Sequence, residues 1–265
     1  MGAVTYRNET VSRDAAVNRR KSTGIHFHDN FELYCLLDGE TKYFIGDEIF
    51  HLKKGDFILV PEGMLHKTDS EECMHNERIL VSFGREILDG GTEAVVRELS
   101  RCKLIHIAVG KRARIEELLH LLEKEYGSGR QYSETMIRLY TLELLTLLCR
   151  HKTDIKPSET EAERLIARIS EYISANYAEE LSLKSLSRRF AVSEGHLSRK
   201  FKAVSGVGLC EYITYVRIHN AERLLSEEGC SVTETAARCG FGDSNYFAAV
   251  FKRIKGVTPY RYSKS

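Results

Sequence analysis

The sequence predicts a two-domain α+β protein, with a β-barrel and a helical hairpin at the N-terminal end and an all-α domain at the C-terminal end. Three observations support this prediction: the chain length, a change in hydrophobic period near Ala113, and an internal repeat near the C-terminus. A chain of 265 residues exceeds the usual range of a single core. The apolar fraction of 42% and the charged fraction of 29% are typical of globular proteins and exclude a disordered chain.

Residues 24–83 are predicted to form short strands. They contain segments rich in aromatic and β-branched residues, and turn-forming pairs separate these segments. The segments are FELYCLL, TKYFIG, EIFHL and DFILVP, and the pairs are Asp38-Gly39, Gly46-Asp47 and Lys54-Gly55. Short strands at even spacing indicate a barrel or a sandwich.

After the strands the apolar residues recur every three and four positions, which predicts two amphipathic helices from about Ala113 onward. The polar segment RHKTDIKPSET, which holds one of the three prolines of the chain, then indicates a linker. We therefore divide the chain into a barrel domain at 1–150, a linker at 151–160 and a helical domain at 161–265. The helices expected in the helical domain lie near residues 165–173, 183–190, 193–204, 211–228, 232–239 and 243–255.

The charge is unevenly distributed along the chain. From Leu181 to the C-terminus, 14 Lys and Arg residues accompany 7 Asp and Glu residues, a balance of +7. The rest of the chain holds 25 basic and 31 acidic residues, a balance of −6. This asymmetry favours a polyanionic partner for the C-terminal domain, the alternative being a basic surface that is only solvated.

The sequence predicts no membrane partner. No apolar run approaches the roughly 18 residues of a spanning helix, and the first 25 residues lack the apolar core of a signal peptide. The seven cysteines are scattered, odd in number and never in a C-x-x-C pair, which is typical of a reducing compartment. We therefore expect a cytoplasmic protein.

An internal repeat lies in the helical domain. At an offset of 49 positions, Ser187, Ala191 and Val192 correspond to Ala236, Gly240 and Phe241. At an offset of 50, Leu197, Phe201, Lys202, Gly206, Val207 and Tyr212 correspond to Phe247, Phe251, Lys252, Gly256, Val257 and Tyr262. One residue is therefore inserted in the second turn, and each copy predicts a helix-turn-helix unit.

The second helix of each copy is expected to have an apolar face and a polar face. Ser193 is the expected N-terminal cap of this helix in the first copy, and Asp243 is the expected cap in the second. Gly240 is expected to end the first helix of the second copy, just before the turn. The inward positions are Leu197, Phe201 and Val204, then Phe247, Val250, Phe251 and Ile254. The outward positions are Gly195, Ser198, Arg199 and Lys202, then Ser244, Asn245, Ala248, Ala249, Lys252 and Arg253. Such helices fit the major groove, where Arg engages guanine, Asn pairs with adenine and Lys neutralises phosphate. The helix between the copies is expected to be about 27 Å long, which is near the roughly 34 Å length of one turn of DNA. It could therefore hold the two recognition helices about one DNA turn apart.

Residues 161–262 resemble the AraC/XylS family of transcription regulators. The segment GFGDSNYFAAVFKRIKGVTPYRY is similar to the family signature over the second unit, and SEGHLSRKFKAVSG is similar to the first recognition helix. The resemblance implies a sequence-specific transcription factor that binds double-stranded DNA. The family's base-approaching positions fall on Gly195, Ser198, Arg199, Ser244, Asn245 and Ala249.

Two of those positions depart from the family pattern, because Gly195 and Ala249 are smaller than the residues of many relatives. Base reading is therefore expected from the larger outward side chains, and phosphate contacts from the nearby cations. The base-reading residues are Ser198, Arg199, Ser244 and Asn245, and the backbone contacts are Lys202, Lys252 and Arg253.

The predicted barrel contains the pattern His26-x-His28-x-x-x-Glu32, followed by Gly55, Pro61, Gly63 and His66. Because side chains alternate along a strand, residues 26, 28 and 32 are expected on one face. The two segments resemble the two motifs of cupin barrels, including Gly39 seven positions after Glu32, while Ser70 departs from the Asn common at the end of the second motif. A cupin-type barrel is also the usual sensor domain of AraC/XylS regulators, which implies an effector-binding function.

Three interpretations of His26, His28, Glu32 and His66 stay open. They are ligands of a divalent Zn, Ni, Mn or Fe ion, the polar lining of a small-molecule pocket, or hydrogen-bonded structural residues. No cofactor follows from the sequence beyond this candidate metal. His51 and His75 lack the motif spacing and are treated as ordinary.

The leucine-rich helix at 133–149 has two interpretations, packing against the barrel or forming a homodimer. We favour the homodimer, because Leu139, Leu142, Leu145 and Leu148 offer more apolar surface than one barrel contact needs. The sequence thus predicts a non-enzymatic regulator that binds DNA, a small-molecule effector and RNA polymerase. The alternative is a metal-dependent cupin enzyme fused to a DNA-binding domain.

Overall fold

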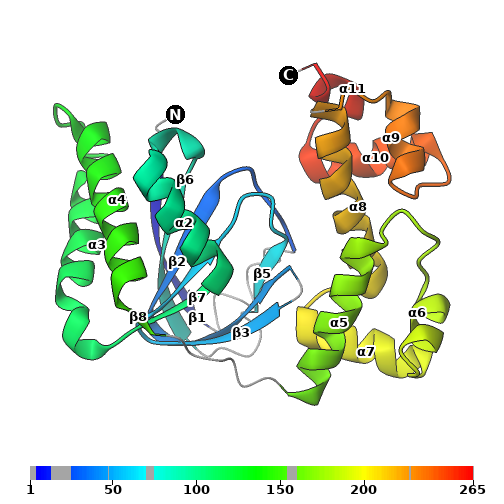
Figure 1. Ribbon diagram of the computed structural model, residues 1–265, viewed down its shortest axis with the longest axis horizontal. Helices are drawn as coiled ribbons and strands as arrows, with labels where there is room; N and C mark the ends of the chain where they lie inside the picture. Colours follow the sequence, from blue (N-terminus) through cyan, green and yellow to red (C-terminus); the bar gives the residue numbers. More distant parts are fainter. Residues whose placement is uncertain are drawn as a thin grey trace. The chain divides into compact units, whose positions relative to one another are not determined.

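The computed structural model describes residues 4–12, 25–46, 48–69, 75–153, 160–226 and 228–264. The chain forms two compact units, the first mainly from Phe27–Ile45 and Phe50–Ser158 and the second mainly from Glu159–Ser265. The first is rich in sheet and the second is helical (Figure 1), which confirms the predicted fold class.

The sheet of the first unit has eight strands in the order β1-β6-β2-β4-β7-β8, and β3 and β5 also pair with β2. The pairs β1/β6, β2/β6, β2/β4, β2/β5, β4/β7 and β7/β8 are antiparallel. The strands are β1 (Val4–Ser12), β2 (Phe31–Ile45), β3 (Glu48–Lys53), β4 (Asp56–Val60), β5 (His66–Asp69), β6 (His75–Phe83), β7 (Leu104–Ile107) and β8 (Lys152–Thr153).

Strand β2 corrects one prediction, because it continues through the turn expected at Asp38-Gly39. Opposite β6 the register shifts between Leu36 and Asp38, so one extra residue is accommodated in β2. Gly39 has a φ of +86°, which glycine adopts without a steric penalty. The glycine therefore supports a bulge in a long strand and not the end of a short one.

Successive side chains of β2 point to opposite faces of the strand and contribute to two different hydrophobic clusters. Leu33 and Cys35 point into the cluster shared with the helices, whereas Tyr34 and Leu36 point into a second cluster with side chains of β3 and β4. Glu32 lies two residues before Tyr34 in β2, so its side chain points to the same face of the strand as the second cluster.

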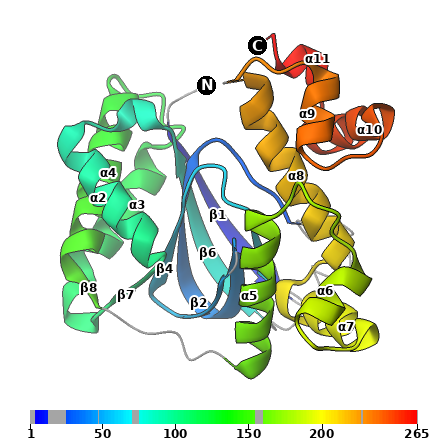
Figure 2. The same cartoon turned by 45° about the vertical axis from the view of Figure 1, so that its right-hand side comes forward.

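Helices α3 (Ala113–Glu125) and α4 (Ser133–His151) form the predicted hairpin. They lie side by side against the sheet (Figures 1 and 2) and contribute Leu118, Leu122 and Leu145 to its core. The sequence reasoning missed helix α2 (Gly90–Cys102), whose N-terminus is a capping box between Asp89 and Thr92. Short 3₁₀ helices cover Arg85–Ile87 and Val109–Lys111.

The second unit contains the six predicted helices and the short α11, which the sequence reasoning missed. The long α8 connects the group α5–α7 to the group α9–α11 (Figure 2). The bounds are α5 (Glu161–Ala175), α6 (Leu183–Arg189), α7 (Glu194–Ser205), α8 (Leu209–Ser226), α9 (Val232–Arg238), α10 (Ser244–Lys255) and α11 (Pro259–Tyr262).

The segment predicted as a linker begins with ordered elements. His151 is the last residue of α4, and β8 pairs with β7 through Thr153 opposite His106. Positions 154–159 lie outside the described residues, and Thr160 then caps α5 in a capping box with Glu163. Among the helices that the structure describes, none has the length and apolarity needed to cross a membrane.

Candidate functional site: two recognition helices and a histidine cluster

The recognition helices α7 and α10 begin as the sequence predicts. The Ser193 hydroxyl accepts a hydrogen bond from the His196 backbone N–H at 3.3 Å, and the Asp243 carboxylate accepts one from the Tyr246 N–H at 2.6 Å. Each helix ends at a glycine in the left-handed region, Gly206 and Gly256. Caps at both ends fix the length of each recognition helix.

Buried aromatic residues set the rotation of each recognition helix. Leu197 and Phe201 of α7 are fully buried, and so are Phe247 and Phe251 of α10. Val204 and Ile254, which were expected inside, are only partly buried because they lie at the edge of each apolar face.

The outward faces carry the predicted DNA contacts. Gly195, Ser198, Arg199 and Lys202 are exposed on α7. On α10, Asn245, Ala249, Lys252 and Arg253 are exposed, while Ser244 and Ala248 are half-buried. A planar guanidinium and a carboxamide therefore project from the two helices, with cations beside them, as a major-groove reading surface requires.

Two contacts of α8 hold the helix-turn-helix units in register, and sequence reasoning missed both. The guanidinium of Arg217 donates to the backbone oxygens of Tyr177 at 2.9 Å and Glu179 at 2.8 Å, and it lies 5.7 Å from the ring centre of Phe241. Burial lowers the pKa of Arg217 from its ordinary value. Glu222 forms a buried ion pair with Lys255 of α10. Because α8 contacts both groups, it sets the spacing of the recognition helices.

In the sheet-rich unit, Glu32 is the centre of the histidine cluster. Its carboxylate is buried at 4% exposure and accepts a hydrogen bond from the Tyr43 hydroxyl at 3.2 Å. An Arg7 nitrogen lies 3.7 Å from the same carboxylate. Burial and then the charge of Glu32 raise the pKa of Tyr43 well above its ordinary value of 10.0, so Tyr43 stays a donor.

His28 and His66 both turn their Nε2 atoms toward Glu32. The Nδ1 atom of His28 is 2.7 Å from the Asn30 carbonyl oxygen, and that of His66 is 2.8 Å from the Met64 carbonyl oxygen. Because a carbonyl only accepts, each Nδ1 carries the proton, and Nε2 of the neutral ring keeps its lone pair. The Nε2 atoms lie 3.6 Å and 3.9 Å from the Glu32 oxygens.

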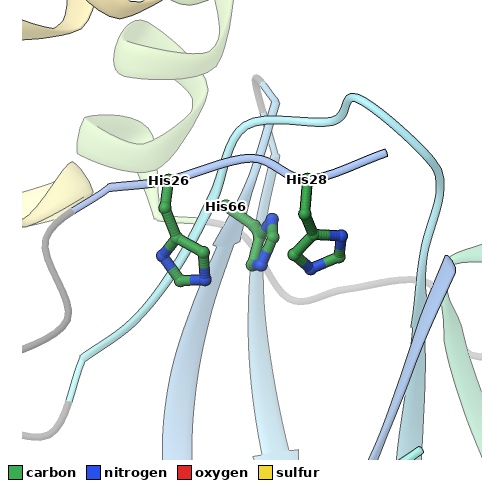
Figure 3. Close-up of side chains that lie close together, drawn as sticks. All are labelled: His26, His28 and His66. Carbon is green, nitrogen blue, oxygen red and sulfur yellow. The ribbon is translucent and has the colours of Figure 1, made fainter. Parts of the chain in front are cut away.

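His26 completes the cluster. One potential ligand atom from each of His26, His28 and His66 lies within 4.8 Å of the others, and the three side chains project to the same side, with the ring of His66 between the other two (Figure 3). The reason given from the sequence was wrong, because only Glu32 lies in β2 while residues 27–30 have no strand structure. A bend at 29–30, and not strand alternation, brings the histidines beside Glu32. His51 is exposed, and the side chain of His75 lies outside the described residues.

Two opposing effects act on the pKa of His28. Burial lowers the pKa of its imidazole, but the hydrogen bond and the charge of Glu32 raise it, and the net result lies above the ordinary 6.5. A proton and a metal ion would therefore compete for this ring.

The comparisons with known proteins agree with both units. Residues 13–135 match the AraC-like ligand binding domain, and residues 186–265 match a helix-turn-helix domain. The chain belongs to the AraC family of transcription regulators. It is a DNA-binding regulator with a ligand-binding domain.

Relatives of this regulator are themselves named as regulators. The transcriptional regulator YpdC of Escherichia coli K12 is 31% identical over 184 residues, which span 68% of this chain and 62% of that protein. The transcriptional activator RhaR of E. coli O139:H28 is 26% identical over 89% of this chain and 86% of its own length. Among solved structures, the C-terminal domain of AraT from Geobacillus stearothermophilus is 28% identical, with a TM-score of 0.38, over 40% of this chain and 88% of that chain.

Proposed function

We propose that this chain regulates transcription as a cytoplasmic homodimer that reads DNA through α7 and α10 and responds to a ligand at the barrel histidines. The observation that supports this proposal is the pair of capped recognition helices with exposed Arg199 and Asn245. The relatives named as activators favour RNA polymerase as a further partner. Effector-dependent regulation then requires that the ligand bind one arrangement of the protein more tightly than another.

The DNA contacts divide into two classes. Arg199 can form two hydrogen bonds to the O6 and N7 atoms of guanine, and Asn245 can pair with adenine, while Ser198 and Ser244 can contact bases at closer range. Lys202, Lys252 and Arg253 neutralise phosphates, which strengthens binding to every sequence. To test the division, sites are selected from random duplexes by the full-length protein and compared with those selected by variants.

We propose that α4 forms the homodimer contact through the face that its own unit leaves open. Leu145 and Leu148, expected in this contact, are instead buried in the core beneath α4. Leu139 is 54% exposed, and Leu142 is partly buried. The exposed apolar surface of α4 at Leu139 and Leu142 is therefore narrower than the sequence predicts, and a second copy of the chain can cover it.

The homodimer is tested by sedimentation of the Leu139→Glu variant. We expect a weaker dimer, because each interface would bury two added carboxylates near a two-fold axis. Val109→Glu is the matched control, since Val109 is 79% exposed on a 3₁₀ helix outside α4. Equal association of both variants would remove α4 from the interface.

At the barrel we propose that His26, His28, His66 and Glu32 bind a divalent metal ion. Ligands about 2.1 Å from a tetrahedral ion lie about 3.4 Å from one another, and the Nε2–Glu32 oxygen distances of 3.6 and 3.9 Å are close to that spacing. The hydrogen bonds from Nδ1 to backbone carbonyls supply the outer contacts that orient metal-binding imidazoles. The polar lining of an organic-effector pocket is the second candidate, favoured by Tyr43, which adds a hydroxyl to the cluster.

We propose that the protein is not an enzyme, and that the site serves sensing. Metal content after dialysis, the melting temperature with added metal and a turnover screen with cupin substrates separate the candidates. Near-stoichiometric metal that is lost in His28→Ala, without turnover, supports a metal sensor. Negligible metal, with a small metabolite that stabilises the wild type and not a His28→Ala, Glu32→Ala variant, supports the organic effector. Metal-dependent turnover would restore the enzyme alternative.

A further inference from the structure

The DNA-binding unit contains a cleft between α5 and the flank of α7 that carries His196 and Lys200. Its volume is about 620 Å³. Its floor is apolar and its rim is basic. The lining residues are Ala162, Leu165, Phe190 and Val192 on the floor, and Arg164, Arg168, His196, Lys200 and Glu161 on the rim.

The rim carries more positive than negative charge, with Arg164, Arg168 and Lys200 against Glu161. Across the described part of the chain, the side chains of Arg164, His196 and Lys200 form no ion pair, although Glu161 also lines the cleft. The guanidinium of Arg168 lies 5.8 Å from the ring centre of Phe190, so it covers part of the floor, and no acidic partner for it is present among the described residues. Several cations around one apolar surface favour an anion with an apolar part.

The second helix-turn-helix unit provides an internal comparison, because two of its three corresponding side chains are buried and the third, Tyr246, is 58% exposed. Val192, His196 and Lys200 of the first unit correspond to Phe241, Tyr246 and Val250. Phe241 and Val250 are 8% and 3% exposed. The Phe241 ring centre lies 5.1 Å from that of Phe247 and 6.3 Å from that of Tyr246.

This difference shows that the helix-turn-helix packing itself does not require an open cleft. The same backbone plan accepts a phenylalanine, a tyrosine and a valine at the three positions. In the first unit the same positions hold a smaller residue, a histidine and a lysine, so the cleft stays open and basic.

We propose that this cleft binds a small organic anion, a molecule with an aromatic or branched apolar body and at least one carboxylate, phosphate or sulfonate group. The volume lies within the range of about 300–1,000 Å³ that small-molecule sites occupy. The apolar body packs on Leu165 and Phe190, and the anionic group faces Arg164 and Lys200. The site is separate from the barrel cluster and does not depend on the function proposed for it.

Such a ligand would act on the recognition helix directly. His196 and Lys200 belong to α7, and so do Ser198 and Arg199 on its outward face. A bound anion reduces the positive charge of the unit, so it weakens affinity for DNA, and DNA weakens the affinity for the anion by the same factor.

The test uses full-length protein and the dye 8-anilino-1-naphthalenesulfonate, an aromatic body with one sulfonate. N-phenyl-1-naphthylamine, which has the same aromatic body without the charge, is the matched ligand control. We expect dye affinity at least tenfold above that of the neutral analogue, with a tenfold loss in the Arg164→Gln, Lys200→Gln variant. The matched protein control is Lys184→Gln, Arg188→Gln, which removes two exposed charges of α6 and should leave dye affinity unchanged.

A second variant closes the cleft with the residues of the other unit: Val192→Phe, His196→Tyr, Lys200→Val. We expect it to lose the dye without a lower melting temperature, because the second unit shows that these residues fit the backbone. Equal affinity for the neutral analogue, or unchanged dye affinity in both variants, would overturn the proposal. Displacement of the dye by an acidic Glu-Leu peptide at lower concentration than by small anions would assign the cleft to a protein segment and overturn the small-molecule assignment.

Discussion

The two helix-turn-helix units share one backbone plan, yet they carry their long outward side chains at different places. At an offset of 50 positions, Gly195 corresponds to Asn245 and Arg199 to Ala249. The first unit therefore presents its proposed base-reading side chain, Arg199, from the middle of the recognition helix, and the second presents Asn245 from the beginning. Lys202 and Lys252 occupy equivalent places. We therefore expect the two units to contact the DNA backbone alike and to read different bases, which predicts an asymmetric DNA site for one chain.

The turns of the two units also differ. Ala191 and Gly240 are equivalent, and both have positive φ, +54° and +75°. Only the second position is crowded, because a Cβ atom on Gly240 would lie 2.8 Å from the Ala178 oxygen and 3.0 Å from the Tyr177 oxygen. The same conformation is therefore tolerable for alanine in one unit and not in the other.

The largest effect is expected for Gly240→Ala. Positive φ costs alanine about 1–2 kcal/mol, and the overlap with two backbone oxygens adds to it, so the second unit should lose about 2 kcal/mol or more. Hydrogen exchange of α9 and α10 amides in the full-length protein measures this loss. Gly242→Ala is the control, since no atom lies within 4 Å of its added Cβ. Equal exchange in both variants would contradict the steric argument.

A smaller effect is expected from removing the reading side chains. Arg199→Ala should cost about 1–3 kcal/mol on the selected DNA site and relax preference at one base pair, because a bidentate contact is lost. Asn245→Ala should relax preference at a different base pair. Titration of selected and random duplexes at one salt concentration separates these outcomes. Equal losses on both duplexes for Arg199→Ala would make Arg199 a phosphate contact.

The phosphate contacts should show no such distinction between units. Lys202→Ala and Lys252→Ala should each weaken binding to all sequences alike and reduce the slope of log affinity against log salt by about 0.9. Both exposed side chains occupy the same helical position, so the two changes should match. If the slopes of the two variants differ from one another, the units do not approach the backbone in the same way.

Much of the helical unit formed by Glu159–Ser265 could be predicted from the sequence, because the sequence signals for its helices are local. Ser193 and Asp243 cap helices three residues away, and Leu197 and Phe247 repeat with helical spacing. The contacts of Arg217 could not be predicted, because they join α8 to backbone oxygens about 40 positions away. The identity of a residue does not indicate which backbone oxygen it will contact when that oxygen is so far away in the sequence.

The sheet-rich unit was less predictable for a related reason. The motif correctly brought together His26, His28 and His66, but the orientation of two rings depends on the carbonyl groups of Asn30 and Met64 in irregular segments. Helix α2 was missed because only Val96 and Leu99 are buried, too few to produce a periodic pattern. Gly39 in the sequence predicts a turn, but the structure has a bulge there, and a glycine at a bulge cannot be told from one at a turn in a sequence.

The smallest effect is expected for Ala191→Gly, and its sign is opposite to that of Gly240→Ala. Ala191 is exposed and its φ of +54° costs alanine about 1–2 kcal/mol, whereas glycine adopts it freely. The greater freedom of glycine in the unfolded chain removes about 0.5–1 kcal/mol of that gain, so a net stabilisation of about 0.5–1 kcal/mol remains. Slower hydrogen exchange of the α6 and α7 amides measures it. Ala203→Gly, an exposed helical position of the same unit, is the control and should destabilise by about 1 kcal/mol. Faster exchange in both variants would show that Ala191 carries no strain, and the conformational equivalence of the two turns would then fail.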